Sequence, residues 1–359
     1  MGLRLPAWEG GPGRRAEKGK GMSHILEVNG LTTVFDGDAG QVVSVDHASF
    51  FVDSGETVCI VGESGCGKSV TSLSIMGLLG RGGRVKEGQA LFEGRDLLAM
   101  PEKELDRLRG NEISMIFQDP LTSLNPVFTI GRQISESIRI HMGLHKEAAM
   151  ERAEGLLEKV GMPDPKAAMK KYPHMLSGGQ RQRVMIAMAL ACGPKLLIAD
   201  EPTTALDVTI QAQIMELLRQ LQRELNMAVI LITHDIGLVA QMADRVLVMY
   251  AGQMIEQAPV LELFDRPAHP YTRALLRSVP SIPRKGGPAL VGRLASIEGS
   301  VPERYGQMAG CRFAERCPYR EGACGSPQTE MELGPGHKAR CFKAGRFSEF
   351  QGSETPKEV

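Results

Sequence analysis

The feature that most constrains the fold is the stretch Gly62 to Ser69, which reads GESGCGKS. It fits G-x-x-x-x-G-K-[ST], the Walker A pattern of phosphate-binding loops. The apolar, β-branched run Thr57 to Val61 predicts a buried strand before it, and Val70 to Leu79 predicts a helix after it. In that context, backbone N–H groups converge on phosphate oxygens in front of a helix N-terminus. The alternative is a glycine-rich turn with an exposed lysine, and the downstream motifs decide between the two.

The side chains of this loop have separate predicted roles. Lys68 is expected to reach the β- and γ-phosphates of a nucleotide, and the Ser69 hydroxyl is expected to hold Mg²⁺. The glycines permit backbone angles that a side chain would forbid, which lets the loop close around a phosphate. The loop residues predicted to contact nucleotide are Gly62, Ser64, Gly65, Cys66, Gly67, Lys68, Ser69 and Val70.

Composition sets broad limits on the class of protein. A chain of 359 residues that is 42% hydrophobic can bury a large core, and its length allows two or three units. A formal net charge of zero argues against nucleic-acid binding driven by overall charge. The longest apolar run, Val184 to Cys192, is about half of the roughly 20 residues that span a bilayer. We therefore expect a soluble or peripheral protein.

The two ends of the chain differ from its middle. Residues 1–23 are rich in Gly, Arg and Lys and lack the apolar region of a signal peptide, so we expect a disordered extension. Met22 is a second candidate start. Without a secretion signal, the seven cysteines belong to a reducing compartment, where disulfides are not expected.

An antiparallel β layer is predicted before the phosphate-binding loop. Its segments are Ile25 to Val28, Thr32 to Phe35 and Val42 to Val52, with the first two separated by Asn29-Gly30. Phe35 is a candidate to stack on an adenine ring, and a core aromatic is the alternative.

Two polar signals follow in the central part of the chain. The predicted strand Ile113 to Phe117 ends at Gln118, whose side chain is a candidate outer ligand for Mg²⁺ or for a nucleophilic water. The pattern then turns helical until Leu176 to Gln180, which reads LSGGQ and precedes a predicted helix, Arg181 to Ala191. A Ser-Gly-Gly turn at a helix N-terminus offers a hydroxyl, free N–H groups and the helix dipole to an anion. An ordinary serine cap is the alternative.

Acidic residues follow the next predicted strand, Lys195 to Ala199. This is the Walker B pattern, in which Asp200 is expected to bind Mg²⁺ through water and Glu201 to orient or deprotonate the attacking water. The later strand Val229 to Thr233 ends in His234, which is expected to reach a γ-phosphate, although a lone histidine is more often structural. Alternating strands and helices predict a mostly parallel sheet with ligands at the carboxyl ends of its strands.

Together and in this order, these motifs resemble the ATPase cassette of ATP-binding cassette (ABC) transporters over about residues 24 to 260. The resemblance implies ATP and Mg²⁺ as cofactors and a head-to-tail dimer, with ATP between Lys68 of one cassette and the LSGGQ turn of the other. It assigns adenine stacking to Phe35 and a D-loop to Asp207, with Thr204 where serine is usual. The implied catalytic residues are Lys68, Glu201 and His234; the implied Mg²⁺ ligands are Ser69, Gln118 and Asp200; and the implied partner-site residues are Ser177, Gly178, Gly179, Gln180 and Asp207.

Two further stretches resemble the dipeptide, oligopeptide and nickel importer branch of that family. They are Gln118 to Pro126, QDPLTSLNP, and His269 to Leu276, HPYTRALL. The resemblance implies two multi-spanning permease subunits, a second identical or homologous ATPase subunit and an external solute-binding protein as partners. It implies that a helical subdomain at about residues 119–190 receives the permeases, and that the protein is peripheral on the cytoplasmic face of the inner membrane.

The C-terminal region contains four closely spaced cysteines, which favour a metal over disulfides. They lack the C-x₂-C spacing usual for zinc, which favours an iron–sulfur cluster, with zinc and unliganded thiols as alternatives. The region also resembles the C-terminal extension of the importer branch, which implies a 4Fe–4S cluster. We expect the metal to fold this segment and the ATP chemistry to stay within the cassette. The cysteines are Cys311, Cys317, Cys324 and Cys341, interleaved with Arg312, Arg316, Arg320 and Lys338, which are expected to offset a cluster's charge.

The sequence therefore predicts an α/β protein with a Walker-type nucleotide-binding core, a mostly parallel sheet, an N-terminal antiparallel β layer and an inserted helical subdomain. An ATPase domain at residues 24–265 precedes an irregular Cys-rich extension at 266–359. The expected function is ATP hydrolysis that powers a di- or oligopeptide importer through dimer closure. An importer of nickel or another small solute is one alternative, and a soluble cassette ATPase acting on DNA, ribosomes or cluster assembly is another. The chain has one cassette and no long heptad region, and its C-terminal region has few aromatic residues, so no nucleic-acid partner is expected.

Overall fold

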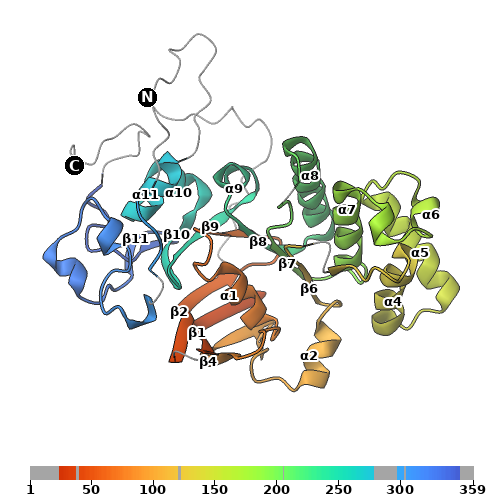
Figure 1. Cartoon of the computed structure of the whole chain (residues 1–359), viewed down its shortest axis with the longest axis horizontal. Coiled ribbons are helices and arrows are strands. Elements are labelled where there is room, and N and C mark those ends of the chain that lie inside the picture. Colours follow the sequence, from red (N-terminus) through yellow and green to blue (C-terminus); the bar gives the residue numbers. More distant parts are fainter. Residues whose placement is uncertain are drawn as a thin grey trace, which may run out of the picture.

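The structure is a computed structural model, and it describes residues 24–37, 40–119, 123–204, 206–278, 297–302 and 305–347. The extension predicted at residues 1–23 lies outside the described residues, as do positions 120–122 of the QDPLTSLNP stretch. Figure 1 shows two sheets at the centre, a group of helices (α4–α7) at one end and the C-terminal strands at the other. Among the described residues, no helix is long and apolar enough to cross a membrane.

An eight-stranded sheet forms the centre, with the strand order β11-β12-β10-β9-β3-β8-β7-β6. Its strands from β9 to β6 are parallel, as predicted, because helices connect them. The strands on the other side of β9 are antiparallel. The bounds are β3 Thr57–Val61, β6 Ile113–Ile116, β7 Leu196–Asp200, β8 Ala228–Thr233, β9 Arg245–Tyr250, β10 Gln253–Pro259, β11 Met331–Gly334 and β12 His337–Ala339.

The predicted β layer is a four-stranded antiparallel sheet in the order β2-β1-β4-β5. The predicted break at Asn29-Gly30 is wrong, because β1 continues through it. Gly30 has a φ of 59°, and the pairing register shifts between Val28 and Leu31, so an irregularity absorbs the glycine. The bounds are β1 Leu26–Gly37, β2 Gly40–Val52, β4 Gly83–Phe92 and β5 Arg95–Asp96.

Helices cover the large sheet and build one end of the molecule (Figure 1). The helices near the sheet are α1 Lys68–Ile75, α2 Glu102–Leu108, α8 Val208–Leu225, α9 Ile236–Met242, α10 Val260–Asp265 and α11 Pro270–Arg277. The group at the end comprises α4 Ile130–Met142, α5 Lys146–Lys159, α6 Pro165–Ala168 and α7 Gly178–Ala189. Short 3₁₀ turns are η1 Pro173–Met175, η2 Tyr305–Gln307, η3 Ala314–Arg316 and η4 Gly322–Gly325.

Two hydrophobic clusters fix the position of the central strands. Along β7, Leu197 and Ala199 pack into the cluster on the side of α4 to α9, whereas Leu196 and Ile198 pack into the cluster with the β layer. Both faces of each parallel strand are therefore buried, which explains why the strands are continuous apolar runs. This packing holds the carboxyl ends of β3, β6, β7 and β8 at one edge of the sheet.

The cysteine segment, defined here as residues 305–347, is more regular than predicted. Its strand β12 pairs with β10, so the segment extends the central sheet instead of forming a separate irregular unit. Phe313 is 2% exposed and belongs, with Tyr305, to the main hydrophobic cluster. Most of the segment is irregular, and two short paired strands and buried aromatic residues tie it to the core.

Candidate nucleotide site and cysteine pocket

The phosphate loop, Gly62–Ser69, connects β3 to α1 and packs closely against neighbouring backbone. A Cβ atom at Gly62 would lie 2.1 Å from the carbonyl oxygen of Met249, and one at Gly67 would lie 2.5 Å from that of Ser44. Gly67 is the N-cap of α1 and has a φ of 105°. Glycine is therefore required at both positions, by space at the first and by space and backbone angle at the second.

Lys68 is buried at the start of α1, with 6% of its surface exposed. Its ammonium group donates hydrogen bonds to the carbonyl oxygens of Gly62 at 2.8 Å and Glu63 at 3.0 Å. The ammonium group is thus held against the backbone of its own loop, and its contact with the phosphates of a nucleotide remains a prediction.

The serine of the loop meets the first acidic residue of the Walker B strand. The Ser69 hydroxyl donates a hydrogen bond of 3.0 Å to Oδ1 of Asp200, although the two residues are 131 positions apart. Burial raises the pKa of the Asp200 carboxyl, and the neighbouring Glu201 adds to this, while Ser69 and Lys68 oppose it. Hydroxyl and carboxylate oxygens are the ligands that Mg²⁺ prefers, and a cation here would favour the ionised carboxylate. The residues therefore fit a magnesium site.

Glu201 collects hydrogen bonds from the ends of three neighbouring strands. Its Oε2 accepts from Gln118 Nε2 and from the Thr204 hydroxyl, both at 2.9 Å, and its Oε1 lies 3.3 Å from Nδ1 of His234. The structure thus brings Gln118, Glu201 and His234 together at the edge of the sheet where ligands were expected. Glu201 has a φ of 46°, a costly angle for a residue with a side chain, which points to a functional constraint. The hydrogen bond from Thr204 was not predicted, because the sequence showed Thr204 only as a replacement for the usual serine.

The signature turn, Leu176–Gln180, lies at the N-terminus of α7, away from the phosphate loop. Ser177 Oγ accepts from the N–H of Gln180 at 3.3 Å, and Gln180 Oε1 accepts from the N–H of Ser177 at 3.1 Å. Ser177 is therefore a helix cap, and both it and Gly178 are exposed to solvent. The turn packs on the segment that caps α8, where Asp207 accepts from the N–H of Ile210 at 3.0 Å. Within the described contacts, Ser177 to Gln180 and Asp207 are not brought to Lys68.

Phe35 lies half-buried on β1. Its ring rests on Gly83 of β4, where a Cβ atom would come within 2.7 Å of Cε1 of the phenylalanine. Among the described residues, Phe35 is paired with Val42 of β2 and Gly83 of β4, both in the β layer.

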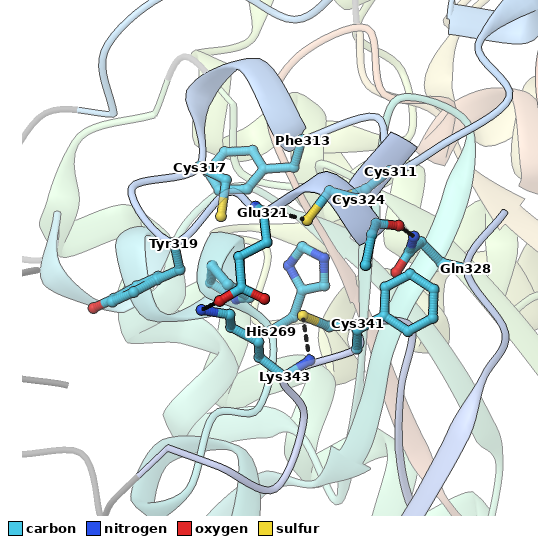
Figure 2. Close-up of a pocket in the computed structure, with 13 residues that line it drawn as sticks. His269, Cys311, Phe313, Cys317, Tyr319, Glu321, Cys324, Gln328, Cys341 and Lys343 are labelled. Carbon is cyan, nitrogen blue, oxygen red and sulfur yellow. Dashed lines mark hydrogen bonds and ion pairs between the residues drawn. The ribbon is translucent and has the colours of Figure 1, made fainter. Parts of the chain in front are cut away.

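The four C-terminal cysteines line one pocket, together with His269 and Phe313. In Figure 2 the sulfur atoms of Cys317, Cys324 and Cys341 point toward a common space. Burial raises the pKa of Cys311 to about 11 and that of Cys317 to about 12. Even so, no three His, Cys, Asp or Glu side chains among the described residues are grouped so that they could hold a metal ion. The other described cysteines, Cys59, Cys66 and Cys192, lie elsewhere and are free.

The cysteine segment also contacts the phosphate loop, which the sequence analysis missed. The Arg316 guanidinium binds both carboxylate oxygens of Glu63, with N–O distances of 2.7 and 3.0 Å. Tyr271, from the HPYTRALL stretch, accepts a hydrogen bond from the N–H of Glu63 at 2.9 Å. The segment and the phosphate loop are therefore in direct contact, whereas the expectation that the ATP chemistry stays within the cassette remains a prediction. No spacing pattern in the sequence predicts the contacts of Arg316 and Tyr271 with Glu63. They arise because the fold brings α11 and the cysteine segment, which pairs with β10, next to the loop.

A phosphate loop, an acidic pair at the end of β7 and a separate signature turn define an ATPase cassette. Comparisons with known proteins agree. A family model described as "ABC transporter" matches residues 45–204, and one described as "Oligopeptide/dipeptide transporter, C-terminal region" matches residues 255–324. An AAA-domain model also matches residues 171–240, inside the ATPase region.

Individual relatives extend this similarity over most of the chain. The oligopeptide transport ATP-binding protein AppD of Bacillus subtilis is 51% identical, over 89% of this chain and 97% of its own length. The dipeptide transport ATP-binding protein DppD of Escherichia coli is 50% identical, over 88% and 96%. The solved dimeric structure of MJ0796, a bacterial ABC transporter cassette, matches with a TM-score of 0.60 at 27% identity, covering 66% of this chain and 98% of that one.

The chain belongs to the ABC transporter family, as an ATP-hydrolysing subunit that carries the oligopeptide/dipeptide transporter C-terminal region. The resemblance found in the sequence is thereby confirmed.

Proposed function

We propose that this chain binds and hydrolyses ATP to power a membrane importer of dipeptides or oligopeptides. The observation that carries the proposal is the meeting of Ser69, Asp200 and Glu201 in a chain whose residues 255–324 match the oligopeptide/dipeptide transporter region. Relatives of half-identical sequence that are named for oligopeptide and dipeptide transport support the substrate class. Import of nickel or another small solute is the alternative substrate reading, and a cassette ATPase without a transport role is the alternative function.

The site residues have distinct proposed roles in hydrolysis. Lys68 and the loop from Gly62 to Val70 bind the phosphates, with Ser69, Asp200 and Gln118 as the ligands of Mg²⁺. When bound with ATP, Mg²⁺ would neutralise charge that develops on the phosphate oxygens. Glu201 orients the attacking water and takes its proton, while Gln118, Thr204 and His234 hold the carboxylate in place. The half-buried Phe35 is proposed to stack on adenine.

A second ATPase subunit, identical or homologous, is proposed to complete the site. The signature turn is exposed and away from the loop of its own chain, which supports contact with ATP on a partner. Ser177, Gly178, Gly179 and Gln180, with Asp207 beside them, would then meet the γ-phosphate across a head-to-tail dimer. ATP binding closes that dimer and hydrolysis opens it.

A groove between the core and the helices at its end is the proposed permease contact. Its lining includes Met76, Leu78, Phe117, Leu124 and Met188, of which Leu78 and Phe117 are exposed apolar side chains. An amphipathic helix from one of two membrane-spanning permeases would bury these groups. We propose that the protein is accordingly peripheral on the cytoplasmic face of the inner membrane, in an importer with an external solute-binding protein. The proposed domains are the ATPase at 24–265, its helical subdomain at about 119–190 and the C-terminal extension at 266–359.

A 4Fe–4S cluster is the proposed occupant of the cysteine pocket. Four thiols from one segment line it, and such clusters take four Cys thiolates. The four cysteines lack the C-x₂-C spacing usual for structural zinc, which favours iron–sulfur over zinc.

Reconstitution tests the proposal. The protein, assembled with its two permeases and binding protein in liposomes, should hydrolyse ATP faster when a dipeptide or oligopeptide is supplied, and Glu201→Gln should remove that rate. Stimulation by nickel ions and not by peptides would refute the substrate class. Protein purified without oxygen should contain iron and sulfide in equal amounts, whereas stoichiometric zinc would refute the cluster.

A further inference from the structure

One arginine joins the cysteine pocket to the phosphate loop. Arg316 ends the 3₁₀ turn η3 and directly precedes Cys317, and its side chain is only 7% exposed. Besides both carboxylate oxygens of Glu63, its guanidinium reaches the Tyr250 hydroxyl at 3.2 Å and the carbonyl oxygen of Glu298 at 2.8 Å. A planar, bidentate guanidinium fixes both the distance and the orientation of a carboxylate, which a lysine ammonium cannot do.

Glu63, which Arg316 holds in place, contacts Lys68, the residue that is proposed to bind phosphate. It is the second residue of the phosphate loop, and its carbonyl oxygen accepts a hydrogen bond from Lys68 at 3.0 Å. Its N–H donates to the Tyr271 hydroxyl. The side chain, N–H and carbonyl oxygen of Glu63 are thus all fixed, and two of the three partners lie outside the loop.

Packed aromatic rings make this support rigid. The ring of Phe313 lies 5.3 Å from that of Tyr250, 5.4 Å from that of Tyr271 and 6.0 Å from that of His269. Phe313 and His269 also line the cysteine pocket (Figure 2). Phe313 in the wall of the pocket therefore packs directly on the tyrosines that contact Arg316 and Glu63, and close-packed side chains transmit a change of shape.

A second contact ties the same segment to the β layer. Arg312 pairs with Asp46 of β2, and the Tyr305 hydroxyl donates to the carbonyl oxygen of Ser44 at 3.4 Å. That carbonyl is the group that lies against Gly67 of the phosphate loop. Both ends of the loop are thus backed by residues 305–316.

We propose that Arg316 is a positioning residue for the phosphate loop, and that the ordered cysteine segment raises nucleotide affinity through it. The inference rests on the proposed ATP-binding role of the loop. Because coupling between two sites is reciprocal, nucleotide should stabilise whatever the four cysteines hold by the same factor.

Equilibrium titration of the full-length, anaerobically purified protein with a fluorescent ATP analogue tests the positioning role. Arg316→Gln should weaken affinity about five- to tenfold, within the usual range of coupling between sites. Arg316→Lys keeps the positive charge but loses the bidentate guanidinium. Its affinity for the analogue should lie between those of Arg316→Gln and the wild type. Arg320→Gln is the matched control, because it removes an exposed arginine three residues after Cys317 and should leave affinity unchanged.

A second comparison isolates the route of the coupling. Cys324→Ser disturbs the pocket at a position distant in sequence from Arg316, and it should weaken nucleotide binding in the wild-type background. In the Arg316→Gln background it should add a clearly smaller loss, because the connection through Arg316 is cut and only the contact through Tyr305 and Ser44 remains.

Two results would overturn the inference. One is an Arg316→Gln protein that binds the analogue as tightly as Arg320→Gln. The other is an equal loss of affinity from Cys324→Ser in both backgrounds. A wild-type chain that binds no nucleotide would instead refute the proposed function.

Discussion

The phosphate loop and the signature turn are built from the same elements but differ in their surroundings. Each is a glycine-containing turn at a helix N-terminus, suited to an anion. Most of the loop is buried or half-buried, with Lys68 bonded to its own backbone and Ser69 bonded to Asp200. In the signature turn Ser177 and Gly178 are exposed, and the side chains of Ser177 and Gln180 bond to each other's backbone N–H groups.

This difference indicates which part of the ATP site a single chain completes, the phosphate loop, and which part needs a partner chain, the signature turn. Around the loop, Asp200, Glu201 and Arg316 are already in position within a single chain. Around the exposed Ser177 and Gly178 of the signature turn, the described contacts come from the turn itself, its own helix and the cap of α8. A change in the loop should therefore affect binding by the monomer, whereas a change in the turn should affect only events that need two chains.

The largest effect is expected from the paired variants Glu201→Gln and Lys68→Ala. Glu201→Gln should keep ATP binding but lower the hydrolysis rate about 10²- to 10⁴-fold, the usual contribution of a general base. Lys68→Ala should instead weaken ATP binding itself, because a buried charge beside the phosphates is lost. Single-turnover hydrolysis and equilibrium binding, measured on both proteins, separate the two effects. Near-normal hydrolysis by Glu201→Gln would exclude Glu201 as the base.

The next largest effect is expected from Gly179→Asp in the signature turn. A carboxylate about 4 Å from a phosphate would cost about 4 kcal/mol at an effective dielectric constant near 20. Dimer formation and hydrolysis should therefore fail, while ATP binding by the monomer survives. Gly155→Asp, on an exposed position of α5 with open space around it, is the control. A monomer affinity as poor as that of Lys68→Ala would argue against a role across the dimer.

The sequence predicts the loop well because its chemistry is local. Eight consecutive residues carry the pattern, and the flanking strand was predicted with the bounds that the structure gives, Thr57–Val61. The meeting of Gln118, Glu201 and His234 was also predictable, since parallel strands place their carboxyl ends at one edge.

Contacts that cross the fold were not predictable in the same way. The pairing of Arg316 with Glu63 joins residues 253 positions apart, and no periodic pattern encodes it. Arg316 was expected to offset the charge of a cluster, since only its closeness to Cys317 in the sequence was visible. The two C-terminal strands were missed because β12 has three residues, too few for an alternating pattern.

A smaller effect on stability should distinguish Gly67→Ala from Gly178→Ala. At Gly67 a new Cβ would meet a backbone carbonyl at 2.5 Å and a φ of 105°, which should cost about 3 kcal/mol of folding free energy. At Gly178 its nearest neighbour would be a side-chain atom of Leu206 at 3.4 Å, an ordinary contact. Urea denaturation should show a lower midpoint only for Gly67→Ala. Equal midpoints would mean that the loop is not more tightly constrained than the turn.

The smallest effect concerns pH and the histidine that supports the loop. His269 caps α11, where its Nδ1 accepts from the N–H of Tyr271 at 3.0 Å. Burial lowers its pKa from the ordinary 6.5 to about 3. The unfolded chain therefore takes up a proton below pH 6.5 that the folded chain refuses, so stability is full above that pH and falls as the pH drops toward 3. By pH 5 the loss from this one group is about 2 kcal/mol.

His269→Asn tests this, because asparagine caps a helix without titrating in this range. The variant loses packing against Phe313 at every pH. The quantity to compare is therefore the slope of the unfolding free energy against pH between pH 7 and pH 5, not the stability at one pH. That slope should be shallower than in the wild type. If His269→Asn kept the wild-type slope, the acid sensitivity would come from other groups, and His269 would not be what makes the support of the loop sensitive to low pH.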